Sequence, residues 1–200
     1  MVLSLGFSYI LKNKSEVIFL DNLMNFILIG KSGSGKSTLS KHICSKYGYS
    51  SYSIGNGVKE FIHDLTTILH DLNPNNELIK LRDMYDVNVK NNYRKHMQLI
   101  GTNLCQIYFG KTCWCNLVDI TTEKYIIEDC RFIHEYEWFK NENTIVIKIV
   151  SDKENKFDHN SETEILNHIE PNLTLYNNGS INELYDKFDE WFMKFSKENI

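Results

Sequence analysis

The feature that most constrains the fold of this 200-residue chain is one loop together with its flanks. Residues 30–37 read Gly-Lys-Ser-Gly-Ser-Gly-Lys-Ser and match the pattern GxxxxGK[ST] in full. The run before them, residues 26–29, is short and continuously apolar, as in a strand buried on both faces. Residues 36–47 then carry apolar side chains at helical spacing, and Gly48 suits the end of that helix. A buried strand that turns through such a loop into an amphipathic helix predicts an α/β fold.

The residue types in the loop indicate its ligand. Glycines permit positive φ, so backbone N–H groups can surround phosphate oxygens. A helix beginning at Lys36 adds the positive end of its dipole. Lys36 would reach the β- and γ-phosphates of ATP, and the Ser37 hydroxyl would bind Mg²⁺. The expected ATP-binding residues are Gly30, Lys31, Ser32, Gly33, Ser34, Gly35, Lys36, Ser37 and Thr38.

The rest of the chain alternates between strand and helix patterns. Further strands are expected at residues 49–54, 125–127, 144–150 and 173–176. Helices are expected at residues 57–71, 77–86, 92–109, 133–141 and 181–195. Because strands separated by helices pair in parallel with right-handed crossovers, we predict a three-layer P-loop NTPase fold. Its parallel β-sheet would have about five strands flanked by helices.

Composition narrows the possible partners. The 22 basic and 26 acidic residues give a net charge of −4, without the basic excess that a nucleic-acid polymer would require. No apolar run approaches the length that spans a membrane. The five cysteines are odd in number and irregular in spacing, which favours reduced thiols in a cytoplasmic protein. We therefore expect small-molecule partners, with neither a nucleic-acid polymer nor a membrane.

Arginine is scarce among the cations. Of the 22 basic residues only Arg82, Arg94 and Arg131 are arginines, in a chain rich in residues with A/T-rich codons. An arginine that remains under such a bias is more often needed for its planar, bidentate guanidinium. Arg131 follows two carboxylates, Glu128 and Asp129, at the end of a predicted strand, where open α/β sheets bind ligands. A carboxylate there could hold Mg²⁺ or steer an acceptor, and Arg131 could clamp a phosphate.

Residues 125–135, Tyr-Ile-Ile-Glu-Asp-Cys-Arg-Phe-Ile-His-Glu, resemble a block of the deoxynucleoside monophosphate kinases of phages and large DNA viruses. In that family the block is two hydrophobic residues followed by x-D-V-R-F-x-N-E. Further blocks in the family's order are residues 94–102 with Trp114, residues 158–162 and residues 177–180. The resemblance covers about residues 24–190.

The resemblance implies a nucleoside-monophosphate-kinase-like fold and the ATP-dependent, Mg²⁺-assisted phosphorylation of (deoxy)nucleoside monophosphates. It implies catalytic roles for Lys36, Arg94 and Arg131, and a magnesium ion held by Ser37 and Asp129, partly through water. The implied acceptor-binding residues are Lys59, Arg94, Gln98, Gly101, Thr102, Asp129 and Arg131.

The resemblance also suggests how the chain is divided. Residues 24–200 would form one kinase domain, with an acceptor-binding helical region at about residues 56–112 and a short lid at about residues 151–162. We expect residues 1–23 to be a peripheral extension or the product of an upstream start codon. If the chain is viral, its expected location is the host cytoplasm.

Some positions depart from the family pattern. Many relatives carry one arginine at the position of Gln106 and another at the position of residues 151–152. His134 replaces the usual asparagine, whereas Lys153 or Lys156 could supply charge to the lid. Because these family arginines are missing, a catalytically degenerate ATP-binding module is an alternative interpretation of the sequence.

One other enzyme class also fits the motifs. Animal-type phosphomevalonate kinases share the loop and a similar D-x-R-x-x-x-E block, here Asp129, Arg131 and Glu135. A homodimer is also possible if the aromatic stripe of the last helix is exposed.

Overall fold

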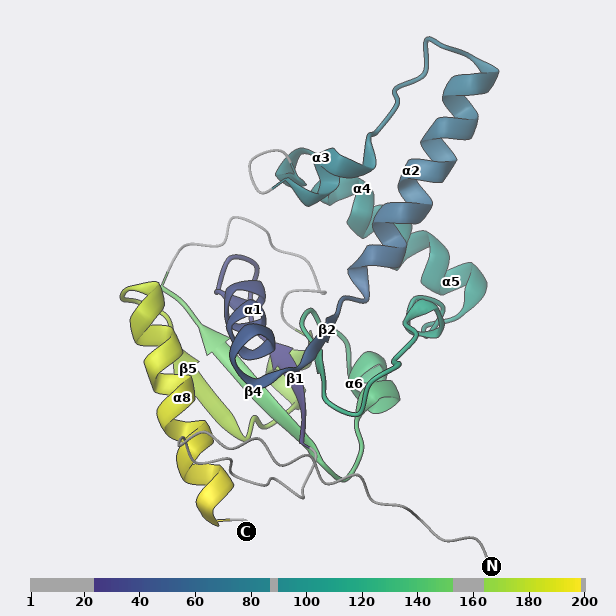
Figure 1. Cartoon of the computed structure of the whole chain (residues 1–200). Coiled ribbons are helices and arrows are strands. Elements are labelled where there is room, and N and C mark those ends of the chain that lie inside the picture. Colours follow the sequence, from purple (N-terminus) through teal and green to yellow (C-terminus); the bar gives the residue numbers. More distant parts are fainter. Residues whose placement is uncertain (1–23, 87–89, 153–163, 199–200) are drawn as a thin grey trace, which may run out of the picture.

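The computed structural model describes residues 24–86, 90–152 and 164–198. Within these ranges, five parallel strands form one sheet in the order β2-β3-β1-β4-β5 (Figure 1). The strands are β1 (Asn25–Ile29), β2 (Ser50–Tyr52), β3 (Tyr125–Ile127), β4 (Thr144–Val150) and β5 (Leu173–Tyr176). The predicted parallel sheet flanked by helices is confirmed.

Helices and helical turns occupy much of the remaining described chain. They are α1 (Lys36–Tyr47), α2 (Gly55–Leu72), α3 (Leu81–Tyr85), η1 (Lys90–Tyr93), α4 (Arg94–Gln98), η2 (Leu99–Cys105), α5 (Gln106–Phe109), η3 (Cys115–Leu117), α6 (Ile133–Phe139), α7 (Glu164–His168) and α8 (Ile181–Glu198). In Figure 1, α1 and α8 lie together on one face of the sheet, whereas α2 leaves the sheet and forms an arm with α3, α4 and α5. The arm therefore stands beside the end of the sheet at which α1 begins.

The central strand explains the three layers. All five residues of β1 are buried, and the side chains of its four apolar residues alternate between two hydrophobic clusters, as a strand's period of two requires. Phe26 and Leu28 join the cluster that includes α1 and α8. Ile27 and Ile29 join the cluster that includes α2, α6 and α7. Because both faces of this strand are covered, neither row of its side chains contacts water. This explains why residues 26–29 are continuously apolar.

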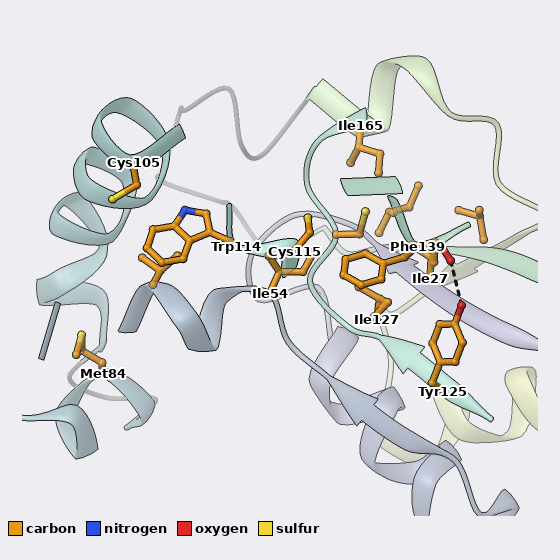
Figure 2. Close-up of a cluster of buried hydrophobic side chains, with 14 of the residues drawn as sticks. Ile27, Ile54, Met84, Cys105, Trp114, Cys115, Tyr125, Ile127, Phe139 and Ile165 are labelled. Carbon is orange, nitrogen blue, oxygen red and sulfur yellow. Dashed lines mark hydrogen bonds between the residues drawn. The ribbon is translucent and has the colours of Figure 1, made fainter. Parts of the chain in front are cut away.

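The second cluster runs without interruption from the sheet into the arm (Figure 2). Ile127 and Phe139 lie at the sheet, Ile54 and Cys115 lie between, and Trp114 lies in the arm. The arm is consequently anchored to the sheet by shared apolar burial, which holds it at a defined place beside the phosphate loop.

The helix predicted over residues 92–109 is wrong in its continuity. The structure has a 3₁₀ turn, a short α-helix, the π-helical turn η2 and another short α-helix. The Gly101 carbonyl in η2 accepts a hydrogen bond from Trp114 Nε1 at 2.7 Å. The Trp114 side chain thus donates to a backbone carbonyl within this helical segment. A side chain that inserts into the backbone hydrogen bonds of a helix accounts for a local π-turn, because it interrupts the regular i→i−4 pattern.

Other boundaries also differ from the sequence prediction. The strand expected at residues 49–54 ends at Tyr52, because the next residues turn into α2 and donate hydrogen bonds to the Asp129 carboxylate. The helix expected at residues 77–86 is confined to α3.

The aromatic stripe of α8 faces the sheet. Phe188 and Phe192 are buried, and both rings contact Phe26 of β1. Trp191 and Phe195 of the same stripe are partly buried, and the homodimer stays a prediction. Large exposed apolar side chains also occur on α5, at Ile107, Tyr108 and Phe109.

Candidate active site

A cleft of about 450 Å³ lies between the phosphate loop and the arm. One wall is formed by the loop and the start of α1, and the other by α2, α3, α4 and η2. The end of β3 and the start of α6 close the space between the walls. Its volume is within the range of pockets that hold small-molecule ligands.

Six of the nine predicted ATP-binding residues line the cleft: Ser32, Gly33, Gly35, Lys36, Ser37 and Thr38. Gly30, Lys31 and Ser34 are not among the lining residues, although Ser34 N donates to the Lys31 carbonyl at 3.2 Å within the loop. Gly30 is required by crowding as well as by its φ of 149°, because a Cβ there would collide with the Ile149 carbonyl of β4.

Lys36 lies across its own loop. Its Nζ donates to the carbonyl oxygens of Gly30 at 2.6 Å and Lys31 at 2.9 Å, and the residue is only 9% exposed. These contacts hold the ammonium group inside the curve of the loop. A cation held there, with the N-terminus of α1 beside it, makes this wall chemically suited to a phosphate anion.

The turn after β5 supports the loop from the other side. Asn177 Nδ2 donates to the Ser34 carbonyl at 2.8 Å. Gly35 has a φ of 110°, and a Cβ at this position would lie 2.5 Å from Asn177 Nδ2. The block at residues 177–180 therefore has a structural task that the sequence did not reveal, namely holding the loop in shape.

Arg94 connects the arm to the phosphate loop. It begins α4, and its Nη1 donates to Ser32 Oγ at 2.8 Å. Arg94 and Arg131 both line the cleft. The Arg82 side chain is 79% exposed and lies 3.5 Å from Asp83. Two of the chain's three arginines thus meet at the cleft, and the third lies outside it.

A row of polar side chains follows the arm wall at intervals of four residues: Arg94, Gln98, Thr102 and Gln106. An α-helix would rotate such a row gradually out of the cleft, but η2 winds more residues into each turn and offsets that drift. Gln98 Nε2 is buried with no hydrogen-bond partner among the described residues. A buried amide donor at a cleft wall is suited to a polar ligand atom.

Apolar side chains complete the arm wall. Val58, Met84, Met97 and Trp114 line the cleft. Gly101 packs so closely against Val58 that a Cβ would lie 2.9 Å from Val58 Cγ1. The glycine in the predicted acceptor-binding set is therefore needed for helix packing.

Lys59 projects from α2 into the cleft. Its Nζ donates to Asn56 Oδ1 at 3.1 Å and lies 4.0 Å from the centroid of the Tyr85 ring. This cation–π contact connects α2 with α3 and keeps the positive charge at the cleft.

The two carboxylates after β3 have different environments. Asp129 accepts hydrogen bonds from Ser53 Oγ at 2.6 Å, Ile54 N at 2.8 Å and Gly55 N at 2.9 Å. Glu128 also lines the cleft, and the hydroxyl groups of Ser51 and Ser40 lie near it and act to lower its pKa. Burial and the nearby Asp129 charge raise the pKa of Glu128.

Glu135 fastens the turn between β3 and α6. The residue is 5% exposed, and its Oε2 accepts from Arg131 N at 2.8 Å and Phe132 N at 3.2 Å. Burial raises the pKa of Glu135 to about 7. The carboxylate thus positions the backbone of Arg131.

All seven residues of the predicted acceptor-binding set line the cleft. Sequence reasoning did not include Met84, Met97, Gln106 or Glu128 in that set. The four-residue spacing from Arg94 could have indicated Gln106, and the position next to Asp129 could have indicated Glu128. Most of the lid expected at residues 151–162, together with the block at residues 158–162, lies outside the described residues.

The fold and the cleft define a class. A parallel sheet whose central strand enters a complete GxxxxGK[ST] loop, with a cation-lined cleft beside it, is a P-loop phosphotransferase of the kinase type. A family model described as deoxynucleotide monophosphate kinase matches residues 81–188, more than half of the chain. The chain belongs to this family, and the resemblance seen in its motifs is confirmed.

Solved structures give distant likenesses. A dephospho-CoA kinase from Campylobacter jejuni has a TM-score of 0.43 at 16% identity and covers 88% of this chain and 98% of its own. A Thermus thermophilus protein has a TM-score of 0.43 at 14% identity, covering 87% and 98%. A sugar kinase from a Janibacter species has a TM-score of 0.37 at 11% identity, covering 84% and 94%. No curated protein matches the chain. Among the helices of the described ranges, none is long and apolar enough to span a membrane.

Proposed function

We propose that this kinase transfers the γ-phosphoryl group of ATP to a deoxynucleoside monophosphate, giving a diphosphate and ADP. The observation that carries the proposal is the hydrogen bond between Arg94 Nη1 and Ser32 Oγ. It brings a cation of the arm against the phosphate loop, so that two phosphates bound by the two walls would meet there. The family match supports a nucleotide as the acceptor.

Such a reaction depends on charge neutralisation and alignment. The acceptor phosphate is already an oxyanion near neutral pH, so no general base is needed. Lys36, Arg94 and Arg131 would neutralise the charge of the transferring group. The arm wall would align the acceptor with ATP and exclude water from the cleft.

Magnesium fits the donors of this site. The Ser37 hydroxyl and a carboxylate after β3 are oxygen donors in the same cleft as the loop. Bound Mg²⁺ would supply charge stabilisation on the phosphate oxygens. The family resemblance implies Asp129 for this role, and Glu128 is a second carboxylate in the same cleft.

The acceptor would bind along the arm. Its phosphate would face Arg94 and Arg131, and its nucleoside would lie against Gln98, Gly101 and Thr102, with Lys59 near the phosphate end. We propose residues 24–200 as one kinase domain whose acceptor-binding region is about residues 56–112. The extension at residues 1–23 lies outside the described residues, and a homodimer remains a prediction.

A turnover screen tests the proposal. ADP release from ATP and Mg²⁺ is measured by a coupled assay with each deoxynucleoside monophosphate, each ribonucleoside monophosphate and phosphomevalonate. We expect release that depends on at least one deoxynucleoside monophosphate and is weak with phosphomevalonate. Turnover with phosphomevalonate alone would place the enzyme in the other class. ATP binding without acceptor-dependent release would instead indicate a non-catalytic module.

A further inference from the structure

The side of the sheet on which each carboxylate lies follows from the strand that precedes it. Ile126 of β3 belongs to the cluster on the α1 face, and Ile127 to the cluster on the α2 and α6 face. Since side chains alternate along a strand, Glu128 falls on the α1 face and Asp129 on the α2 face. Their surroundings agree: the hydroxyl groups of Ser40 of α1 and Ser51 of β2 lie close enough to Glu128 to lower its pKa, whereas Asp129 accepts hydrogen bonds from the start of α2.

Asp129 is engaged at the start of α2. Its Oδ1 accepts from Ile54 N, and its Oδ2 accepts from Ser53 Oγ and Gly55 N. These bonds satisfy backbone donors that a helix N-terminus leaves open, and the negative charge also suits the positive end of the helix. Asp129 therefore stabilises the junction where the arm leaves the sheet.

Glu128 shares its face of the sheet with the metal-binding hydroxyl of the phosphate loop. Ser40 lies one helical turn after Ser37 on α1, and residues three apart occupy the same side of a helix. Ser40 Oγ donates to Ser51 Oγ at 2.8 Å, and these two hydroxyl groups are the neighbours that lower the pKa of Glu128. Glu128 and Ser37 also line the same cleft. Glu128 is thus the carboxylate that shares the α1 side of the cleft with Ser37.

We propose that Glu128, and not Asp129, is the carboxylate that holds Mg²⁺ with Ser37, directly or through water, while Asp129 positions α2. The inference rests on the proposed function, since it takes ATP to be the ligand of the loop. Oxygen donors in small number, completed by substrate phosphates, are the usual protein contribution to a magnesium site. The family block resembled by residues 125–135 has no set residue at position 128, so this assignment is particular to the chain.

The test measures how strongly Mg²⁺ tightens ATP binding. Isothermal titration calorimetry on the full chain gives the dissociation constant of ATP with Mg²⁺ and with EDTA, and the ratio of the two constants reports the metal. We expect Glu128→Gln to lower this ratio about tenfold or more, while binding in EDTA is unchanged or tighter. Asp129→Asn should keep the ratio and lower the melting temperature. Glu137→Gln, which neutralises an exposed carboxylate paired with Lys140, should change neither quantity.

The outcomes separate this inference from the proposed function. Failure of the unmodified chain to bind ATP in either buffer would reject the proposed function itself. ATP binding without any effect of Mg²⁺, a normal ratio in Glu128→Gln, or an equal loss in Asp129→Asn would overturn the inference alone. Glu128→Asp retracts the charge by one methylene and should give an intermediate ratio. It replaces the glutamine variant if that variant does not fold.

Discussion

The two walls of the cleft are built from different parts of the chain. The loop wall is mainly backbone: glycines at positive φ, loop carbonyls that accept from Lys36, and a Ser34 carbonyl that accepts from Asn177. The arm wall is mainly side chains, carried by helices as short as α4 and α5. Short helices are marginal alone and depend on tertiary contacts. We infer that the loop wall tolerates few changes, whereas the arm wall can change its ligand by changing side chains.

The largest effect is expected on the loop wall. Lys36→Ala should lower turnover by about 10²–10³-fold or more, because it removes a cation from the transferring phosphoryl group. The protein should stay folded, since Lys36 contributes two hydrogen bonds to an otherwise glycine-shaped loop. ADP release and circular dichroism measure the two quantities. Lys197→Ala, at an exposed position on α8, is the control and should behave as the unmodified protein.

The arginines test whether the arm wall takes part in the chemistry. Arg94→Ala and Arg131→Ala should each lower turnover by about 10²–10³-fold. Arg82→Ala is the matched control, because its side chain is exposed outside the cleft, and it should change turnover little. The coupled ADP assay measures all three variants. Near-normal turnover in Arg131→Ala would remove that residue from the catalytic set.

The pH dependence of stability tests Glu135, which fastens the turn between β3 and α6 where the two walls of the cleft meet. Its pKa is raised from 4.5 to about 7 in the folded chain, so the folded state holds this proton more tightly than the unfolded state does. The stability that protonation contributes is fully present below about pH 4.5 and is lost as pH rises through about 7. The free energy of unfolding should fall by up to about 3 kcal/mol over this window.

Glu135→Gln is the comparison for that pH profile. Its side-chain carbonyl can still accept from Arg131 N, but the group no longer titrates. Urea unfolding at several pH values should therefore show a flatter profile for the variant than for the unmodified chain. Identical profiles would mean that Glu135 does not titrate in this window.

Gly101 tests how closely the arm is packed, and its effect is the smallest. Gly101→Ala should cost about 1–3 kcal/mol of stability, because the new Cβ would overlap Val58. It should also raise the acceptor KM more than it changes kcat. Urea unfolding and steady-state kinetics measure these effects. Adding Val58→Ala should restore part of the stability, and a double variant no more stable than the single one would point to another cause.

The sequence predicted best where the chemistry is local. Lys36 and Ser37 both belong to the eight-residue motif at 30–37, and their neighbours in sequence are also their neighbours in space. β1 and α1 were predicted for the same reason, since a buried strand and an amphipathic helix each follow from their own residues. Arg94 and Arg131 were identified by motif blocks, and the structure brings both to the cleft.

Prediction was weaker where a contact from elsewhere decides the local structure. The π-turn at Gly101 accompanies a hydrogen bond from Trp114, which is thirteen residues away. The end of β2 is set by Asp129, more than seventy residues further along the chain. Such contacts leave no periodic trace in the segment that they alter.

By itself the sequence determined a P-loop α/β fold, and it predicted a phosphate site at residues 30–37 and two arginines suited to nucleotide phosphates. The tertiary structure decided which carboxylate faces which wall, because Glu128 and Asp129 are adjacent in sequence but point to opposite faces of the sheet. It also decided that α2 through α5 form a wall of the cleft, since that arrangement depends on apolar burial shared with the sheet. Motifs record local chemistry, whereas the choice of face and wall depends on packing between distant segments.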